Sequence, residues 1–201
     1  MTDPDTPTRI LAAADALFGE IGYDGVSVRD IAERAGVNKA LVFYHFGSKD
    51  ELFARILHRY YTEHQDALER AFATDLPVRQ RLHRVIDAYV DYISENRHYP
   101  RLVQRLVAGS GAPMAPIADN LGALFQSIVE ALRDVAPAAG PLSARHFFVT
   151  FSGAVINYFT YAPVLAPVWQ GDPLSDEGIA ERRAHLHWLV DALLGEMRPA
   201  R

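Results

Sequence analysis

Four side chains that could recognise nucleic acid lie close together in this chain. Lys39, Tyr44, His45 and Lys49 carry ammonium, phenol and imidazole groups, which hydrogen-bond to phosphates and to base edges. The chain has 20 Lys and Arg residues, and Lys39 and Lys49 are its only lysines. We interpret this pair as a local positive site for phosphate, although an Arg-rich composition could give the same distribution by chance.

Two short helices joined by a tight turn must position these groups. Ser27 followed by Asp30 predicts a capping box at the start of the first helix. Gly36 predicts the end of that helix, because glycine adopts the left-handed conformation without steric cost. Asn38 can cap the second helix at once. The pattern therefore predicts a helix-turn-helix within 27–49.

The second helix has an inward and an outward face. At about 100° per residue, Val42 and Phe46 lie one above the other and point inward, and Tyr44 points the opposite way. Such a face suits the major groove, where apolar atoms meet thymine methyls and polar atoms reach base edges. The alternative is that Tyr44 and His45 pack against the preceding helix. The groups around Tyr44 or at the border of its face are Lys39, Ala40, Leu41, Phe43 and His45.

From Ile10 to Leu52 the chain resembles the DNA-binding motif of the tetracycline-repressor (TetR) family of bacterial regulators. The resemblance is carried by the leader ILAAADALFGEIGYDGVSVRDIAERAGV and the closing run FYHFGSKDEL. The chain departs from the family at Leu41, where Ser or Thr is more usual, and at Phe43, where Tyr is usual; each change removes a hydroxyl. The resemblance implies that the residues at or near DNA are Ser27, Val28, Arg29, Lys39, Ala40, Leu41, Phe43, Tyr44, His45 and Lys49. For Arg29, an ion pair with Glu33 is the alternative.

Length and composition limit the number of domains and the class of protein. The 201 residues, 49% of them hydrophobic, allow one or two domains with a real core. A net charge of −5 argues against a general nucleic-acid binder, so few phosphate contacts per subunit are expected. The chain has no cysteine, and no run approaches the roughly 18 apolar residues of a membrane span. The acidic N-terminus lacks the basic residues of a signal peptide, which favours a cytoplasmic protein.

The rest of the chain predicts further helices and an all-α fold of about nine helices. We expect a DNA-binding domain at 1–48 and an effector-binding and dimerisation domain at 49–201. The helix at 143–162 is apolar or aromatic nearly all round, so it needs cover on two sides. An irregular connection is expected from 163 to 173. The other predicted helices are 6–21, 49–73, 78–97, 100–108, 115–135 and 175–194.

A ligand cavity is expected among the helices after position 78. Aromatic side chains with few polar groups line such cavities, so an apolar or aromatic small-molecule effector is favoured. His146 could contact this ligand, or could be a satisfied polar group in the core or at a subunit interface. The candidate lining residues are Tyr89, Tyr92, Arg105, Phe125, His146, Phe147, Phe151 and Tyr158.

Enzymatic and metal-binding functions find little support in the sequence. It contains no glycine-rich phosphate loop, no nucleophile elbow and no pair of histidines at helical metal-site spacing. We therefore predict no catalytic residue, no cofactor and no metal.

The resemblance implies a ligand-responsive regulator, most often a repressor, that binds a pseudo-palindromic double-stranded operator. It also implies a homodimer formed through the helices at 143–162 and 175–194. The alternative is a helical protein-interaction or ligand-sequestering module that does not bind DNA.

Overall fold

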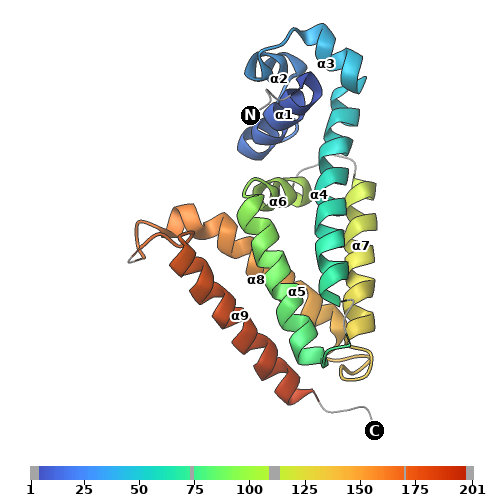
Figure 1. The fold of residues 1–201 in the computed structure, drawn as a ribbon, viewed down its shortest axis with the longest axis vertical. Helices are drawn as coiled ribbons and strands as arrows, with labels where there is room; N and C mark the ends of the chain where they lie inside the picture. Colours follow the sequence, from blue (N-terminus) through green and yellow to red (C-terminus); the bar gives the residue numbers. More distant parts are fainter. Residues whose placement is uncertain (1–4, 73–74, 109–113, 170, 198–201) are drawn as a thin grey trace. The chain divides into compact units, whose positions relative to one another are not determined.

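The computed structural model describes residues 5–72, 75–108, 114–169 and 171–197, and helices joined by turns and loops make up this part of the chain (Figure 1). No strand occurs in these ranges, which confirms the predicted all-α class. The helices are α1 (Thr6–Ile21), α2 (Val28–Ala35), α3 (Lys39–Phe46), α4 (Lys49–Phe72), α5 (Val78–Glu95), α6 (Tyr99–Ala108), α7 (Met114–Ala131), α8 (Ala144–Leu165) and α9 (Asp176–Glu196).

The end of α8 differs from the prediction. The helix was expected to stop at 162, but it continues through Pro163 to Leu165. Proline removes one N–H and crowds the carbonyl four residues earlier, which disrupts the middle of a helix far more than its last turn. The N–H of Ala166 donates to the carbonyl of Ala162 at 2.8 Å and closes the turn around the proline.

The helices form two compact units. The first comprises Met1–Thr62 with His98–Asp119, and the second comprises Glu63–Arg97 with Asn120–Arg201. The expected domain boundary at 48/49 coincides with the start of α4, and the first unit continues beyond it. α4 contributes its first part to one unit and its last part to the other.

The first unit is built on the inward faces of α1, α2 and α3. Phe18, Ile31, Val42 and Phe46 are buried there, and the inward position of Val42 and Phe46 is as predicted. The ring of Phe18 meets that of Phe53 on α4 edge to face, with centroids 5.1 Å apart. A three-helix bundle alone buries little apolar surface, so α4 supplies part of the core on which the helix-turn-helix rests.

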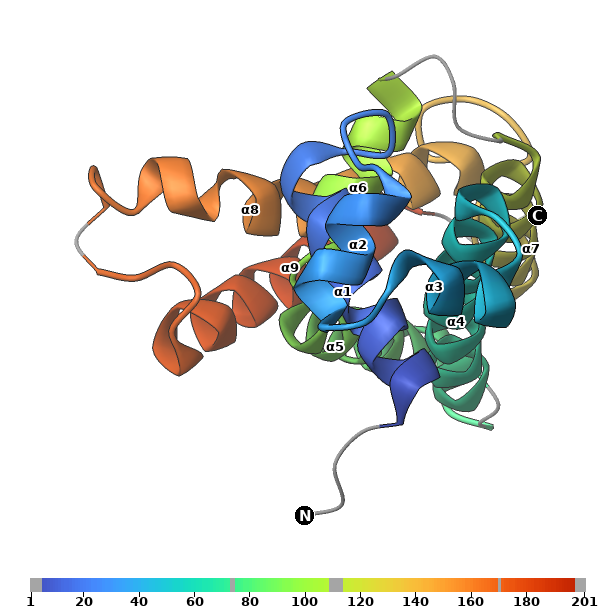
Figure 2. The same cartoon turned by 90° about the horizontal axis from the view of Figure 1, so that it is seen from above.

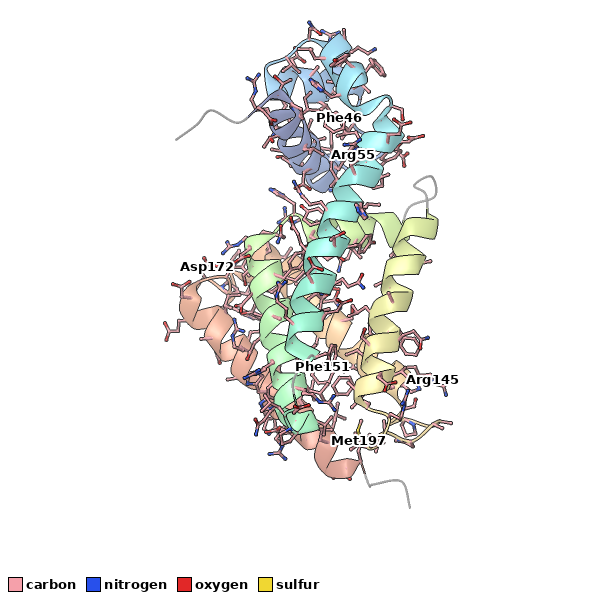
Figure 3. The ribbon with its side chains drawn as sticks, turned by 45° about the vertical axis from the view of Figure 1, so that its right-hand side comes forward. Phe46, Arg55, Arg145, Phe151, Asp172 and Met197 are labelled. Carbon is pink, nitrogen blue, oxygen red and sulfur yellow. The ribbon has the colours of Figure 1, made fainter. Side chains whose placement is uncertain are left out.

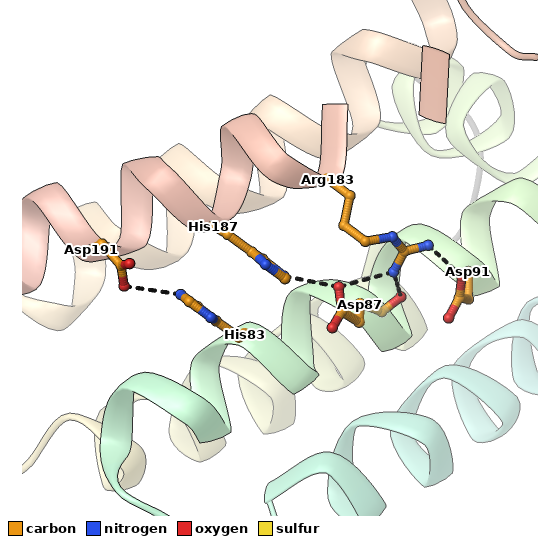
Figure 4. A network of polar contacts seen from close by, with 6 residues as sticks. All are labelled: His83, Asp87, Asp91, Arg183, His187 and Asp191. Atoms are coloured by element: carbon orange, nitrogen blue, oxygen red, sulfur yellow. Dashed lines mark hydrogen bonds and ion pairs between the residues drawn. The ribbon is translucent and has the colours of Figure 1, made fainter. Parts of the chain in front are cut away.

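The second unit is organised around α5, α8 and α9. α5 and α9 pack against each other along ion pairs and a face-to-face pair of imidazoles (Figure 4). On α8 the buried aromatic and apolar residues recur at every fourth position, namely Phe147, Phe151, Val155 and Phe159. Figures 1 and 2 both show the α8–α9 connection standing out from α5.

The opposite side of α8 stays uncovered. The helix is long and apolar enough to cross a membrane by length and composition, with a mean hydropathy of 1.3, although no apolar run of that length had been expected. A single helix of this kind is weak evidence for a span, because a helix buried in a protein passes the same test. Val164 is 74% exposed, and Val149 and Tyr161 are also exposed. This side of α8 is therefore exposed in the part of the chain that the structure describes.

Candidate functional site

The turn between α2 and α3 is held by local hydrogen bonds. The Ser27 hydroxyl accepts from the N–H of Asp30 at 3.2 Å, and the Asp30 carboxylate accepts from the N–H of Ser27 at 2.8 Å. These two bonds form the predicted capping box. The Asp30 carboxylate also accepts from the Ser27 hydroxyl at 2.7 Å, and the bonds from the hydroxyl and the N–H of Ser27 lower the pKa of Asp30. Gly36 takes φ 65° and ψ 38°, the left-handed conformation expected of it. The Asn38 side chain then accepts from the N–H of Leu41 at 2.9 Å and starts α3.

A residue that sequence reasoning missed holds the same turn from α1. The Arg9 guanidinium donates to the carbonyl of Ala35 through Nη2 at 2.8 Å and to the carbonyl of Gly36 at 3.0 Å. These carbonyls are at the C-terminus of α2, where helix geometry leaves acceptors unsatisfied and the helix dipole is negative. A cation on α1 was visible in the sequence, but nothing local indicated the turn as its partner.

The outward face of α3 is exposed as the helical wheel predicted. The side chain of Tyr44 is 81% exposed, so it does not pack against α1. Lys39, Ala40 and Phe43 are also exposed, while Leu41 and His45 are half-buried. The Tyr44 and His45 rings lie edge to face with centroids 5.0 Å apart. The Lys39 ammonium lies 5.5 Å from the centre of the Phe43 ring.

The inner side of α3 is fixed by packing against the rest of the first unit. Val42 and Phe46 are buried directly beneath it, and the guanidinium of Arg55 on α4 lies 5.7 Å from the centre of the Phe46 ring (Figure 3). α3 is therefore held by its inner side while its polar and aromatic groups point to solvent. A single short helix with one exposed face fits the width of the major groove of B-DNA.

The N-terminus of α2 offers a second set of candidate groups. Ser27 and Arg29 are exposed and Val28 is half-buried. In the described part of the chain no ion pair joins Arg29 to Glu33, the alternative that the sequence left open. The neighbouring Arg34 instead pairs with Glu20 at 3.0 Å.

The structure gives Lys49 a different set of partners from those expected. Its ammonium donates to the carbonyls of Tyr23 and Val26, both at 3.0 Å, and lies 4.1 Å from the centre of the Tyr23 ring. The side chain thus ties the first turn of α4 to the connection between α1 and α2. A phosphate contact by Lys49 stays a prediction, and the group that would make it is already bonded to the protein.

The second unit contains an apolar cavity of about 40 Å³. Tyr89, Phe147 and Phe151 line it, as expected; Figure 3 labels Phe151. Residues from α4, α5, α7 and α8 complete the lining, and sequence reasoning did not name them. They are His64, Leu68, Leu82, Val85, Ile86, Leu124, Ile128, Phe148, Ser152 and Val155.

Five other expected ligand residues lie elsewhere. Tyr92 is buried and stacks on His64 with centroids 5.0 Å apart, Phe125 meets Phe148 edge to face, and His146 is exposed. Arg105 belongs to the first unit and donates to the carbonyl of Glu20 at 2.8 Å. Tyr158 donates to the carbonyl of Pro173 at 2.7 Å. It lines a separate open groove of about 530 Å³ near Asp172 at the α8–α9 connection (Figure 3).

His64 is the most informative of the missed residues. Its ring stacks on that of Tyr89 with centroids 4.6 Å apart, and burial lowers its pKa to about 4. A usable signal was present in the sequence, because positions 60, 64 and 68 share one face of α4. His64 was considered only as a metal ligand, so it was not named among the lining residues.

The fold and the exposed face together define an all-helical protein with an N-terminal helix-turn-helix. Residues 10–56 match the family model described as "Bacterial regulatory proteins, tetR family".

Curated relatives match the same N-terminal part of the chain, and a solved structure matches its fold. The chain is 34% identical over 95 residues to the HTH-type transcriptional activator FasR of Mycolicibacterium smegmatis, covering 47% of this chain and 43% of that protein. It is 54% identical over 48 residues to the HTH-type transcriptional repressor Rv3405c of Mycobacterium tuberculosis, covering 24% of this chain and 26% of that protein. The match thus spans less than half the length of either relative. A tetR-family regulatory protein from Rhodococcus RHA1 has the same fold, with a TM-score of 0.74 and 20% sequence identity. The superposition covers 99% of this chain and 100% of that protein.

Proposed function

We propose that this protein is a ligand-responsive transcriptional regulator, without enzymatic activity, that represses by binding a pseudo-palindromic DNA operator as a homodimer. The observation that carries the proposal is the outward face of α3. Tyr44 is 81% exposed on a helix whose inner side is fixed, within a segment that matches a family of regulatory proteins. A role inside bacterial cytoplasm, where operators are, follows from this proposal.

Dimerisation is supported by the exposed apolar side chains of α8, α9 and their connection. Trp188 on α9 is 61% exposed, and Tyr161, Val164, Val168 and Trp169 are also exposed on α8 and the residues after it. Exposed apolar patches of this kind mark protein–protein surfaces. A two-fold dimer also presents two recognition helices, which compensates for the few cationic groups near each one.

Coupling between ligand and DNA would run through α4. Lys49 ties the start of this helix to the α1–α2 connection, and His64 and Leu68 near its other end line the cavity. A ligand that expands the cavity would shift α4 and thereby the helix-turn-helix. The ligand lowers DNA affinity only to the extent that it binds more tightly to the conformation that does not bind DNA.

The test is a gel shift with DNA from upstream of the protein's own gene, at two salt concentrations. We expect a shift that weakens at the higher salt. Tyr44→Ala should lower the affinity about tenfold to a hundredfold, because base contacts contribute about 1–3 kcal/mol each. Tyr44→Phe separates the hydroxyl from the ring, and Val107→Ala, an exposed position on α6, is the control.

Two results would contradict the proposal. One is the absence of any shift at low salt, which favours a protein-interaction or ligand-sequestering module. The other is a folded Tyr44→Ala variant that binds the same DNA as tightly as wild type, which would remove α3 from the interface.

A further inference from the structure

We propose that the cavity of the second unit selects uncharged hydrophobic molecules and rejects carboxylates and ammonium ions of the same shape. This inference rests on the proposed function, because it takes this cavity to be the effector site. It adds the chemical class of the effector and the physical basis of its selection.

The first support is the composition of the cavity wall. None of the described residues that line it is Asp, Glu, Lys or Arg. Most of the wall is aliphatic or aromatic, contributed by side chains such as Leu82, Ile128 and Val155 that are almost completely buried. A charge brought into such a site loses its hydration and gains no counter-charge, which is the least favourable way to bury an ion.

The polar side chains at the wall supply no charge either. His64 is 5% exposed, and its burial lowers its pKa to about 4, so its imidazole is neutral at physiological pH. Its ring stacks on those of Tyr89 and Tyr92, nearly parallel to both at 17° and 8°. Tyr89 hydrogen-bonds to Ser152, and burial raises the pKa of the phenol, which therefore stays protonated. These groups can share a hydrogen bond with a hydroxyl or a carbonyl, but they cannot neutralise an ion.

The size of the cavity indicates how a ligand enters. A volume of about 40 Å³ holds little more than one water molecule, whereas ligand cavities measure roughly 300–1,000 Å³. Side chains must therefore move. Phe147 and Phe151 stack with centroids 4.3 Å apart, and Phe148 is half-buried against the edge of Phe125. A hydrophobic ligand that displaces Phe148 makes apolar contacts in place of the aromatic contacts that are lost. An ion cannot make such contacts.

The experiment compares matched ligands on the purified full-length chain without DNA. The pairs are 1-naphthalenemethanol with 1-naphthoate, and decan-1-ol with decanoate, measured by thermal shift and calorimetry at pH 7.5. We expect at least one alcohol to raise the melting temperature and to bind at least thirtyfold more tightly than its carboxylate. Equal or tighter binding of the carboxylates, or no binding of either alcohol, would overturn the inference.

Two variants locate the binding in this cavity. Val155→Phe should fill the space and abolish binding of the alcohol, while Val107→Phe, the same change on the exposed surface of α6, should leave it unchanged. If Val155→Phe does not fold, Leu124→Lys provides the second test, because Leu124 is only half-buried on α7 and its replacement can keep the ammonium partly solvated. We expect at least a tenfold gain in carboxylate binding; no gain would count against the inference.

The inference and the proposed function can fail separately. A protein that shifts operator DNA but prefers carboxylates would overturn only the ligand class. A protein that prefers the alcohols but shifts no DNA would overturn only the regulator.

Discussion

Lys49 lies beside the helix-turn-helix and is bonded to the protein itself. Its ammonium bonds to two carbonyls of the α1–α2 connection, so it positions the start of α4. Lys39, ten positions earlier, is exposed at the start of α3, where its ammonium can reach a phosphate.

A salt titration distinguishes the two roles. We expect Lys39→Ala to reduce the slope of log affinity against log salt by about one for each phosphate contact that it removes. Lys49→Met should leave that slope nearly unchanged and lower the free energy of unfolding by about 1–2 kcal/mol, because two hydrogen bonds to a charged group are lost. Equal changes of slope in the two variants would show that Lys49 also contacts phosphate.

His64 makes the stability of the protein depend on pH. Its pKa falls from 6.5 to about 4 on folding because burial disfavours the charged imidazole. Below pH 6.5 the unfolded chain therefore binds a proton that the folded chain does not, so stability decreases as the pH falls from 6.5 towards 4. The slope is about 1.4 kcal/mol per pH unit, or roughly 3 kcal/mol over the whole interval.

Urea unfolding at pH 7, 5.5 and 4.5 measures this effect. His64→Phe keeps an aromatic ring against the two tyrosines but cannot be protonated. The difference in unfolding free energy between wild type and variant therefore reports on His64 and not on the other histidines. We expect the variant to gain stability relative to wild type as the pH falls. A difference that does not change with pH would show that the imidazole is not buried as a neutral group.

At the scale of elements, the packing of α5 on α9 combines charge with ring stacking. Arg183 on α9 bridges Asp87 at 3.0 Å and Asp91 at 2.6 Å, and His187 lies 2.8 Å from Asp87 (Figure 4). The ring of His187 stacks on that of His83 with centroids 4.2 Å apart. All of these side chains are partly exposed, so each pair alone contributes little. The shared carboxylate of Asp87 makes them a network.

A double-mutant cycle measures this coupling. We expect Asp87→Ala and Arg183→Ala to show an interaction energy of about 0.5–1 kcal/mol in unfolding experiments, decreasing at high salt. The exposed pair Arg133 and Glu130, neighbours on consecutive turns, is the matched control and should couple less. Additive effects at Asp87 and Arg183 would mean that apolar contacts alone hold α9 on α5.

At the scale of the whole molecule, the uncovered sides of α8 and α9 predict a second subunit. Trp188→Glu replaces an exposed apolar side chain of α9 with a charge and should convert the dimer to a monomer in sedimentation velocity experiments. Operator affinity should fall at least tenfold, because the two recognition helices are no longer linked. Val107→Glu, on α6, is the control. A wild-type protein that is monomeric at micromolar concentration would contradict the dimer.

Much of the DNA-binding segment could be predicted because its signals are local. The capping box of Ser27 and Asp30, the left-handed Gly36 and the cap at Asn38 each depend on residues within a few positions. The exposure of Tyr44 over buried Val42 and Phe46 follows from helical periodicity alone. The all-α class and most helix positions follow from the same rules.

The tertiary structure alone decided which distant groups meet. Lys49 bonds to carbonyls 26 and 23 positions away, and Arg9 caps a helix 26 positions away. Periodicity shows that Tyr89, Phe151 and His146 lie on helices, but not that the first two face one cavity while the third faces solvent. Helix signals arise from neighbours in sequence, whereas the partners of a side chain depend on how separate helices pack, and no local pattern encodes that packing.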